Sequence, residues 1–162
     1  MKLKIIFALF CILMVLVVQG EFLQEKLDKA AYYAAMDSGN LDAVNKEISV
    51  VTSLSFSGKD GYEGALLMRK AGLLAHPPEK LHFFKIGRIK LEAALLNDKD
   101  NAEFHFLRFA IQEHAPNIVK YHNDLYTDKE FIKKTYKDLP PVVQHAIMDY
   151  TRKSKLLTAQ DL

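Results

Sequence analysis

Apolar residues recur at intervals of three and four along most of the chain, the spacing that places side chains on one face of an α-helix. The pattern is most regular at Leu41, Val44, Ile48 and Val51. No segment shows the sustained alternation of apolar and polar residues that predicts a half-buried β-strand. The β-branched cluster at 48–52 continues a helical stripe. The sequence therefore predicts an all-α fold.

Glycine, proline and capping residues divide this pattern into short helices. Ser38-Gly39 is typical of a helix end, because glycine tolerates the left-handed backbone found there. Asn40 and Asn101 are of the type that caps the first turn of a helix. A proline disfavours helical backbone in the residue before it, so Pro77 and Pro116 mark further boundaries. The eight expected helices span about residues 23–37, 41–51, 62–75, 78–96, 102–114, 118–125, 128–138 and 141–150. In the first of them, the apolar stripe consists of Leu23, Leu27, Ala30, Ala31 and Ala34.

Three local patterns refine these boundaries. Thr127 and Glu130 have the spacing of a capping box, in which both side chains satisfy backbone N–H groups at a helix start. Residues 53–61 contain three serines and two glycines and predict a loop. After Lys155 we expect a final turn at most.

Short turns between consecutive helices favour antiparallel packing, so we expect antiparallel helix pairs stacked in a short array or an irregular bundle. The helix over 78–96 is apolar around a wide arc, which predicts a place at the centre of the fold. Gly87, Leu91 and Ala94, followed by the polar turn 97–103, resemble the second helix of a tetratricopeptide repeat. The resemblance is partial, because Pro77 and Pro78 fall where the first helix of such a repeat should be continuous.

The first 20 residues have the features of an export signal. Lys2 and Lys4 precede 14 apolar residues, Ile5 to Val18, whereas a membrane-spanning helix needs about 20. Val17 and Gly20 are small residues at the positions that a signal peptidase prefers. We therefore expect cleavage after Gly20, with an uncleaved membrane anchor as the alternative.

Cleavage would leave residues 21–162 as a single helical domain in the periplasm or outside the cell. Cys11, the sole cysteine, would leave with the signal, so the domain could form no disulfide. The loss of two lysines reduces 22 basic residues to 20, against 20 acidic residues. A net charge of zero argues against nucleic-acid binding, which needs a concentrated cationic face. We expect membrane contact through the signal segment alone, before its cleavage.

The sequence contains no motif for catalysis, a cofactor or a metal. Its six histidines never stand three or four residues apart, the spacing that aims two imidazoles at one ion. No serine lies in a Gly-x-Ser-x-Gly turn. A pair of carboxylates could still hydrolyse a glycosidic bond, since many acids are present. We expect no cofactor and no enzymatic activity, and a hydrolase without a recognisable motif stays open.

Arg108 is the most informative single residue, because it lies between Leu107 and Phe109 on an apolar helix. A guanidinium there must extend to solvent or find a carboxylate inside the fold. Glu92 is the expected partner, since it too has apolar neighbours one turn away. We predict an ion pair that fixes how the helices over 78–96 and 102–114 pack, and an anion-binding role for Arg108 is the alternative.

Four parts of the chain are distinctive when taken together: Tyr62–Met68, Lys90–Ala94, Phe106–Arg108 with Gln112 and Pro116, and Asp128–Phe131. They resemble an uncharacterised family of exported helical proteins of Bacteroidetes-type bacteria. The resemblance implies export, size and helicity, and no activity, substrate or cofactor.

Seven tyrosines could furnish a binding groove, since tyrosine combines a large contact area with a polar tip. The candidate binding residues are Arg108, Glu92, Gln112 and Tyr62. The first hypothesis is a non-catalytic binding or scaffold protein that holds a peptide or protein partner on one face. The alternative is a helical bundle that encloses a small apolar ligand. An enclosed cavity would favour the ligand, whereas a solid core with an exposed groove would favour the peptide.

Overall fold

The computed structural model describes residues 26–162, which form seven α-helices and three short 3₁₀ helices. The α-helices are α2 (Lys29–Asp37), α3 (Leu41–Ser53), α4 (Lys59–Leu73), α5 (Pro77–Asn97), α6 (Ala102–His114), α7 (Leu125–Thr135) and α8 (Pro141–Thr151). The 3₁₀ helices are η1 (Asn117–Val119), η2 (Tyr136–Asp138) and η3 (Ala159–Asp161). The all-α prediction is confirmed.

The expected export signal and its cleavage position lie outside the described residues, as does Leu23. Within 26–162, no helix combines the length and apolarity needed to cross a membrane.

Side-chain caps start three of the helices. Asp28 accepts hydrogen bonds from the N–H groups of the first turn of α2, and Asn40 does the same for α3. Asn101 accepts from the Phe104 N–H at 3.1 Å and begins α6. Gly39, after the end of α2, has a positive φ of 64°. The helix boundaries predicted at Gly39, Asn40 and Asn101 are therefore correct.

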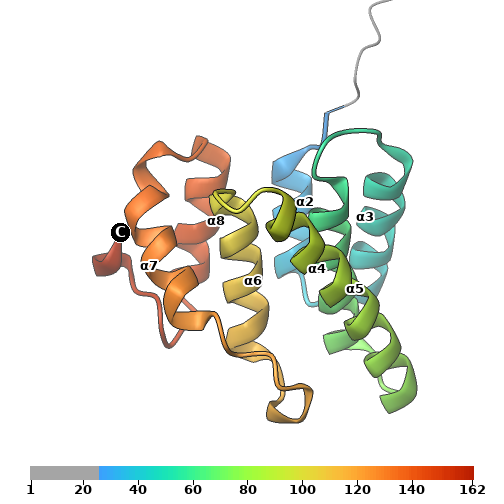
Figure 1. Ribbon diagram of the computed structural model, residues 1–162. Helices are drawn as coiled ribbons and strands as arrows, with labels where there is room; N and C mark the ends of the chain where they lie inside the picture. Colours follow the sequence, from blue (N-terminus) through green and yellow to red (C-terminus); the bar gives the residue numbers. More distant parts are fainter. Residues whose placement is uncertain (1–25) are drawn as a thin grey trace, which may run out of the picture.

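Consecutive helices run antiparallel and stack side by side into a short array (Figure 1). The α4–α5 pair is especially close, because two glycines face each other in it. A Cβ atom on Gly87 would lie 2.5 Å from the Gly64 carbonyl oxygen, and one on Gly64 would lie 2.6 Å from the Gly87 oxygen. No side chain fits at either position, so glycine allows the two backbones to touch.

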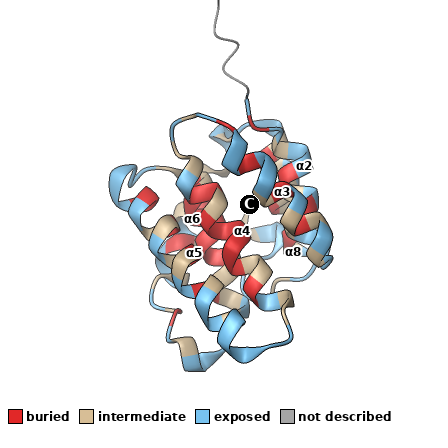
Figure 2. Cartoon of the chain, turned by 90° about the vertical axis from the view of Figure 1, so that its right-hand side faces the viewer, coloured by how far each residue is buried: buried red, intermediate tan, exposed pale blue. Residues whose placement is uncertain are grey.

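Helix α6 lies at the centre of the array, and all its residues from Phe104 to Phe109 are buried. Phe104 and Leu107 belong to one apolar cluster, formed with α2 to α5. Phe106 and Phe109 belong to a second cluster, formed with α7, α8 and the C-terminal segment. Figure 2 shows buried residues on the inner faces of α4, α5 and α6. The central helix is thus α6.

The prediction that the helix over 78–96 is central is wrong. Helix α5 buries one face, but Ile89 and Leu96 on its other face are 69% and 70% exposed. Part of the wide apolar arc of α5 is therefore exposed to solvent and is not covered by another helix.

The helical stripe expected at the N-terminal end needs a similar correction. Ala30, Ala31 and Ala34 are exposed, and α2 buries Tyr32 and Ala35 instead.

Several other predicted helix and loop boundaries were also partly wrong. The helix expected over 118–125 is only the 3₁₀ turn η1, and α7 already begins at Leu125. Thr127 and Glu130 therefore lie inside α7 and form no capping box. The loop expected over 53–61 is shorter, because α3 extends to Ser53 and α4 starts at Lys59. Beyond Lys155 the segment packs onto the fold, and Leu157 has no exposed surface.

Candidate functional site

Arg108 stands at the centre of a polar network that joins α5, α6 and α7. Its Nη1 atom donates to Glu92 Oε2 on α5 at 3.0 Å. Its Nε and Nη2 atoms donate to the two carboxylate oxygens of Asp128 on α7, at 2.8 and 2.7 Å. A planar guanidinium matches a carboxylate in this two-bonded geometry, which makes it one of the strongest polar contacts in proteins. Arg108 therefore fastens both neighbouring helices to α6.

Asp128 is the most deeply buried member of the network, with no exposed surface. Besides Arg108, it contacts His105 through an Nδ1–Oδ1 distance of 2.6 Å. The other ring nitrogen of His105 lies 2.8 Å from the Lys99 carbonyl oxygen. Both nitrogens thus face acceptors, an arrangement that the doubly protonated imidazolium satisfies. Burial alone lowers the pKa of His105, but the bonds to Asp128 and Lys99 outweigh it and raise the pKa.

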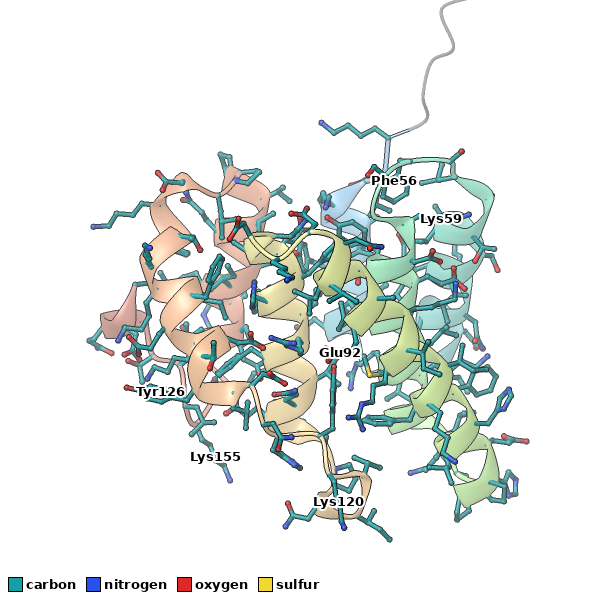
Figure 3. All side chains as sticks on the ribbon, viewed as in Figure 1. Phe56, Lys59, Glu92, Lys120, Tyr126 and Lys155 are labelled. Atoms are coloured by element: carbon teal, nitrogen blue, oxygen red, sulfur yellow. The ribbon has the colours of Figure 1, made fainter. Side chains whose placement is uncertain are left out.

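Three further residues, Tyr121, Gln112 and Asp124, extend the network toward the surface. The Tyr121 hydroxyl donates to Glu92 Oε1. Gln112, which is fully buried, donates to Asp124 Oδ2 at 3.0 Å and accepts from the Asp124 N–H at 3.2 Å. Asp124 Oδ1 also lies 3.7 Å from Arg108 Nη2. Figure 3 shows Glu92 at the junction of α5 and α6. The network therefore links the buried core of the array to the loop before α7.

The members of this network satisfy one another. Arg108 has two carboxylate partners, and Asp128 has two cationic or hydrogen-bonding partners. Breaking such a pair leaves an uncompensated buried charge, which is far more costly than the pair is stabilising. The arrangement thus fixes how three helices pack, and its polar atoms are already engaged by protein groups. Among residues 26–162, no group of three or more metal-ligating side chains is placed to hold an ion.

A second feature is a groove between α2 and α8, with α6 as its floor. Its volume is about 320 Å³. Ala34, Phe106, Val142 and Ala146 are among the apolar residues that line it. Ala34, on α2, is exposed to solvent. The hollow is therefore an apolar recess on the surface.

Charged and polar side chains surround this groove. His145 and Asp149 lie on α8 and Lys153 lies just beyond its end, at intervals of four residues, and all three line the groove. Lys153 pairs with Asp37 at the end of α2, across the groove. His145 Nε2 lies 3.2 Å from Asp149 Oδ2. An apolar floor within a charged rim is the usual composition of a protein-binding surface.

No protein-family model, curated protein or solved structure matches the chain. The similarity to exported helical proteins of Bacteroidetes-type bacteria therefore stays a prediction.

The structure brings together three of the four candidate residues that the sequence nominated. Arg108 and Glu92 form the predicted ion pair, and Gln112 shares Asp124 with Arg108. Tyr62 belongs to a different cluster, in which its hydroxyl donates to Glu103 Oε2 at 2.7 Å.

That second cluster joins α2, α4 and α6 around the carboxylate of Glu103. Lys29 Nζ lies 2.7 Å from Glu103 Oε2, and the Tyr33 hydroxyl donates to Oε1 at 2.6 Å. Burial raises the pKa of Tyr62, and the nearby Glu103 charge raises it further. Tyr62 therefore remains a neutral hydrogen-bond donor, whose partners all come from the protein.

Sequence reasoning missed Asp128 and the groove. Asp128 lies between Thr127 and Lys129, and these two polar neighbours give no sign that it is buried. The groove gave no signal either. It joins α2 to α8, whose groove-lining residues lie more than 100 positions apart, and a helical pattern does not report which distant helices meet.

Proposed function

We propose that this chain is an exported, non-catalytic binding protein that holds an apolar segment of a partner peptide in the groove between α2 and α8. The groove carries the proposal, because it combines an apolar recess of about 320 Å³ with an exposed, charged rim. The rim includes His145 and Asp149 of α8 and Lys153 just beyond its end. Such side chains can bind the polar backbone and charged groups of a peptide whose apolar side chains fill the recess.

The arrangement of polar groups supports binding over catalysis. Phe106 of α6 and Val142 and Ala146 of α8 are among the apolar residues that line the groove. Ser154, near the end of α8, already donates its hydroxyl to Glu113 at 2.7 Å and accepts the Leu157 N–H at 2.8 Å. A hydrolase, which needs convergent polar groups in a cleft, gains no support from this geometry.

A small apolar ligand is the second candidate. The volume of the groove lies at the lower end of the range for ligand pockets, about 300–1,000 Å³. The groove is open along its charged rim, where the side chain of His145 is 79% exposed and that of Lys153 is 47% exposed. An open recess covers a small ligand incompletely, whereas a peptide can bury the recess and contact the rim together. The geometry therefore favours the peptide.

Selection from a library of random displayed peptides tests the proposal. Ala34 and Ala31 are both exposed on α2, but only Ala34 lines the groove. Ala34→Trp should fill the recess and abolish binding of the selected peptides, whereas Ala31→Trp should leave their affinity within about twofold of wild type. Peptides that bind the two variants equally well would refute the proposal. Binding of an apolar fluorescent naphthylamine in place of any peptide would favour the small ligand.

A further inference from the structure

The N-terminal half of α5 carries a basic face that lies beside the loop before α7. Leu81, Lys85 and Arg88 are spaced by four and three residues, which places them on one side of the helix. The Arg88 guanidinium lies 4.7 Å from the centre of the Tyr121 ring, in the loop 115–124. The Phe84 ring contacts the same tyrosine at 5.7 Å between centroids. Tyr121 thus holds the loop against this part of α5.

Two large aliphatic side chains are exposed there. Leu81 is 46% exposed and Ile118 is 88% exposed. The start of α5 and the loop 115–124 project from the same end of the molecule (Figure 1). Lys120, at the tip of the loop, points away from the fold (Figure 3). We call Leu81, Lys85, Arg88, Ile118 and Lys120 the basic tip.

The cations of the basic tip lack acidic partners in the part of the chain that the structure describes. Lys85, Arg88 and Lys120 form no ion pair with any carboxylate of residues 26–162, whereas Lys29, Lys90 and Lys129 all do. Glu92, one turn along α5 from Arg88, and Asp124, at the end of the loop, already contact Arg108. The positive charge of the tip is therefore free to act on an outside partner.

The backbone of the loop provides a separate observation. Lys120 has a φ of 48°, the left-handed region that glycine adopts without strain. Glycine at this position would relax the backbone, yet the chain places a lysine there. This backbone ends η1, where the Lys120 N–H donates to the Asn117 carbonyl oxygen at 3.1 Å, and it leaves a cationic side chain exposed on the loop.

We infer that the basic tip docks the folded domain onto an anionic lipid surface. A bilayer accepts protruding aliphatic side chains into its interface while its headgroups attract the flanking cations. The tip projects from the fold with exposed aliphatic and cationic side chains, so it suits a deformable lipid surface better than an acidic protein, which would need its own matching pocket. Docking through this tip is independent of the α2–α8 groove.

Co-sedimentation with lipid vesicles tests the inference. The purified chain is mixed with vesicles of phosphatidylcholine alone or of phosphatidylcholine with phosphatidylglycerol. Binding should require the anionic lipid and weaken as salt is added. Lys85→Gln with Lys120→Gln should lower the partition coefficient about 25-fold, which is about fivefold for each lost cation. Ile118→Ser should weaken binding and leave its salt dependence unchanged.

The control variant is Lys134→Gln with Lys137→Gln, which removes two exposed lysines of α7 and η2. It should bind as the wild type does. Failure of the wild type to bind anionic vesicles would overturn the inference, and this is the result expected if the tip serves an acidic protein. Equal losses in the two double variants would also overturn it, because attraction would then depend on total charge and not on the tip.

Discussion

Asp128 has no exposed surface, and two of its contacts come from the Arg108 guanidinium. Arg108→Met would leave this carboxylate buried without its main counter-charge. We expect the free energy of unfolding to fall by about 3–5 kcal/mol, measured by urea denaturation. Glu92→Gln is the matched control, since the Glu92 side chain is 36% exposed, and it should cost only about 1 kcal/mol. Equal losses in the two variants would contradict a buried charge pair centred on Asp128.

His105 makes the stability of the fold depend on pH. Its raised pKa means that the folded state binds the proton more tightly than the unfolded state, whose ordinary value is 6.5. The stabilisation of the fold by protonated His105 is therefore fully present below pH 6.5, and it is lost as the pH rises through the raised pKa of His105. The difference in unfolding free energy between wild type and His105→Gln should shrink over that interval. A difference that stays constant with pH would show that the imidazolium is not formed.

Glu47 is the opposite case, a buried acid without compensation. One of its carboxylate oxygens is buried without a hydrogen-bond partner in the described part of the chain. Burial raises the pKa of Glu47, and the nearby Asp28 raises it further. The stabilising effect of protonation is complete below the ordinary value of 4.5 and is lost as the pH rises through the raised value. Glu47→Gln should therefore raise the free energy of unfolding at pH 7 by about 1 kcal/mol, and a loss at that pH would contradict this assignment.

At the scale of the elements, the α4–α5 pair depends on the contact between two glycines. A Cβ on Gly87 would lie 2.5 Å from the Gly64 oxygen and 2.8 Å from Met68 Cγ. Gly87→Ala should lower the midpoint of thermal unfolding, with a loss of about 1–3 kcal/mol. Gly72 lies in α4, and a Cβ atom added there would meet no atom within 4 Å. Gly72→Ala should therefore stabilise the helix by up to about 1 kcal/mol. Stabilisation by both substitutions would show that the two helices are not in backbone contact.

The elements that the sequence predicted well have their determinants nearby in the chain. Asn40 and Asn101 cap helices through N–H groups two or three residues away. Thr127 and Glu130 have the same kind of local spacing, but the chain before them already turns into a helix at Leu125. A local capping pattern therefore indicates that a helix is present more reliably than where it starts.

The candidate site shows the same limit. Arg108 and Glu92 could be paired from sequence, because each is a charged residue among apolar neighbours on adjacent helices. Asp128 could not, because its burial depends on how α7 packs against α6. The exposure of Ala34 likewise depends on Tyr32, which occupies the inward side of α2.

For the whole molecule, the near balance of 22 basic and 20 acidic residues concealed how the charges are distributed. Arg108, Lys29 and Lys90 are paired with carboxylates of neighbouring helices, whereas the cations of the basic tip are not. The array thus presents two different surfaces, an apolar groove between α2 and α8 and a positively charged end. We propose that the groove holds a peptide and that the basic tip contacts lipid.

The most direct measurement maps where a selected peptide binds. Amide chemical shifts of the isotope-labelled chain are recorded by nuclear magnetic resonance while the peptide is added. The account predicts that the largest changes occur at Ala34 on α2 and at Ala146 and Asp149 on α8, with saturation at a single-site stoichiometry. Changes confined to α5 and the loop 115–124, with α2 and α8 unaffected, would contradict it.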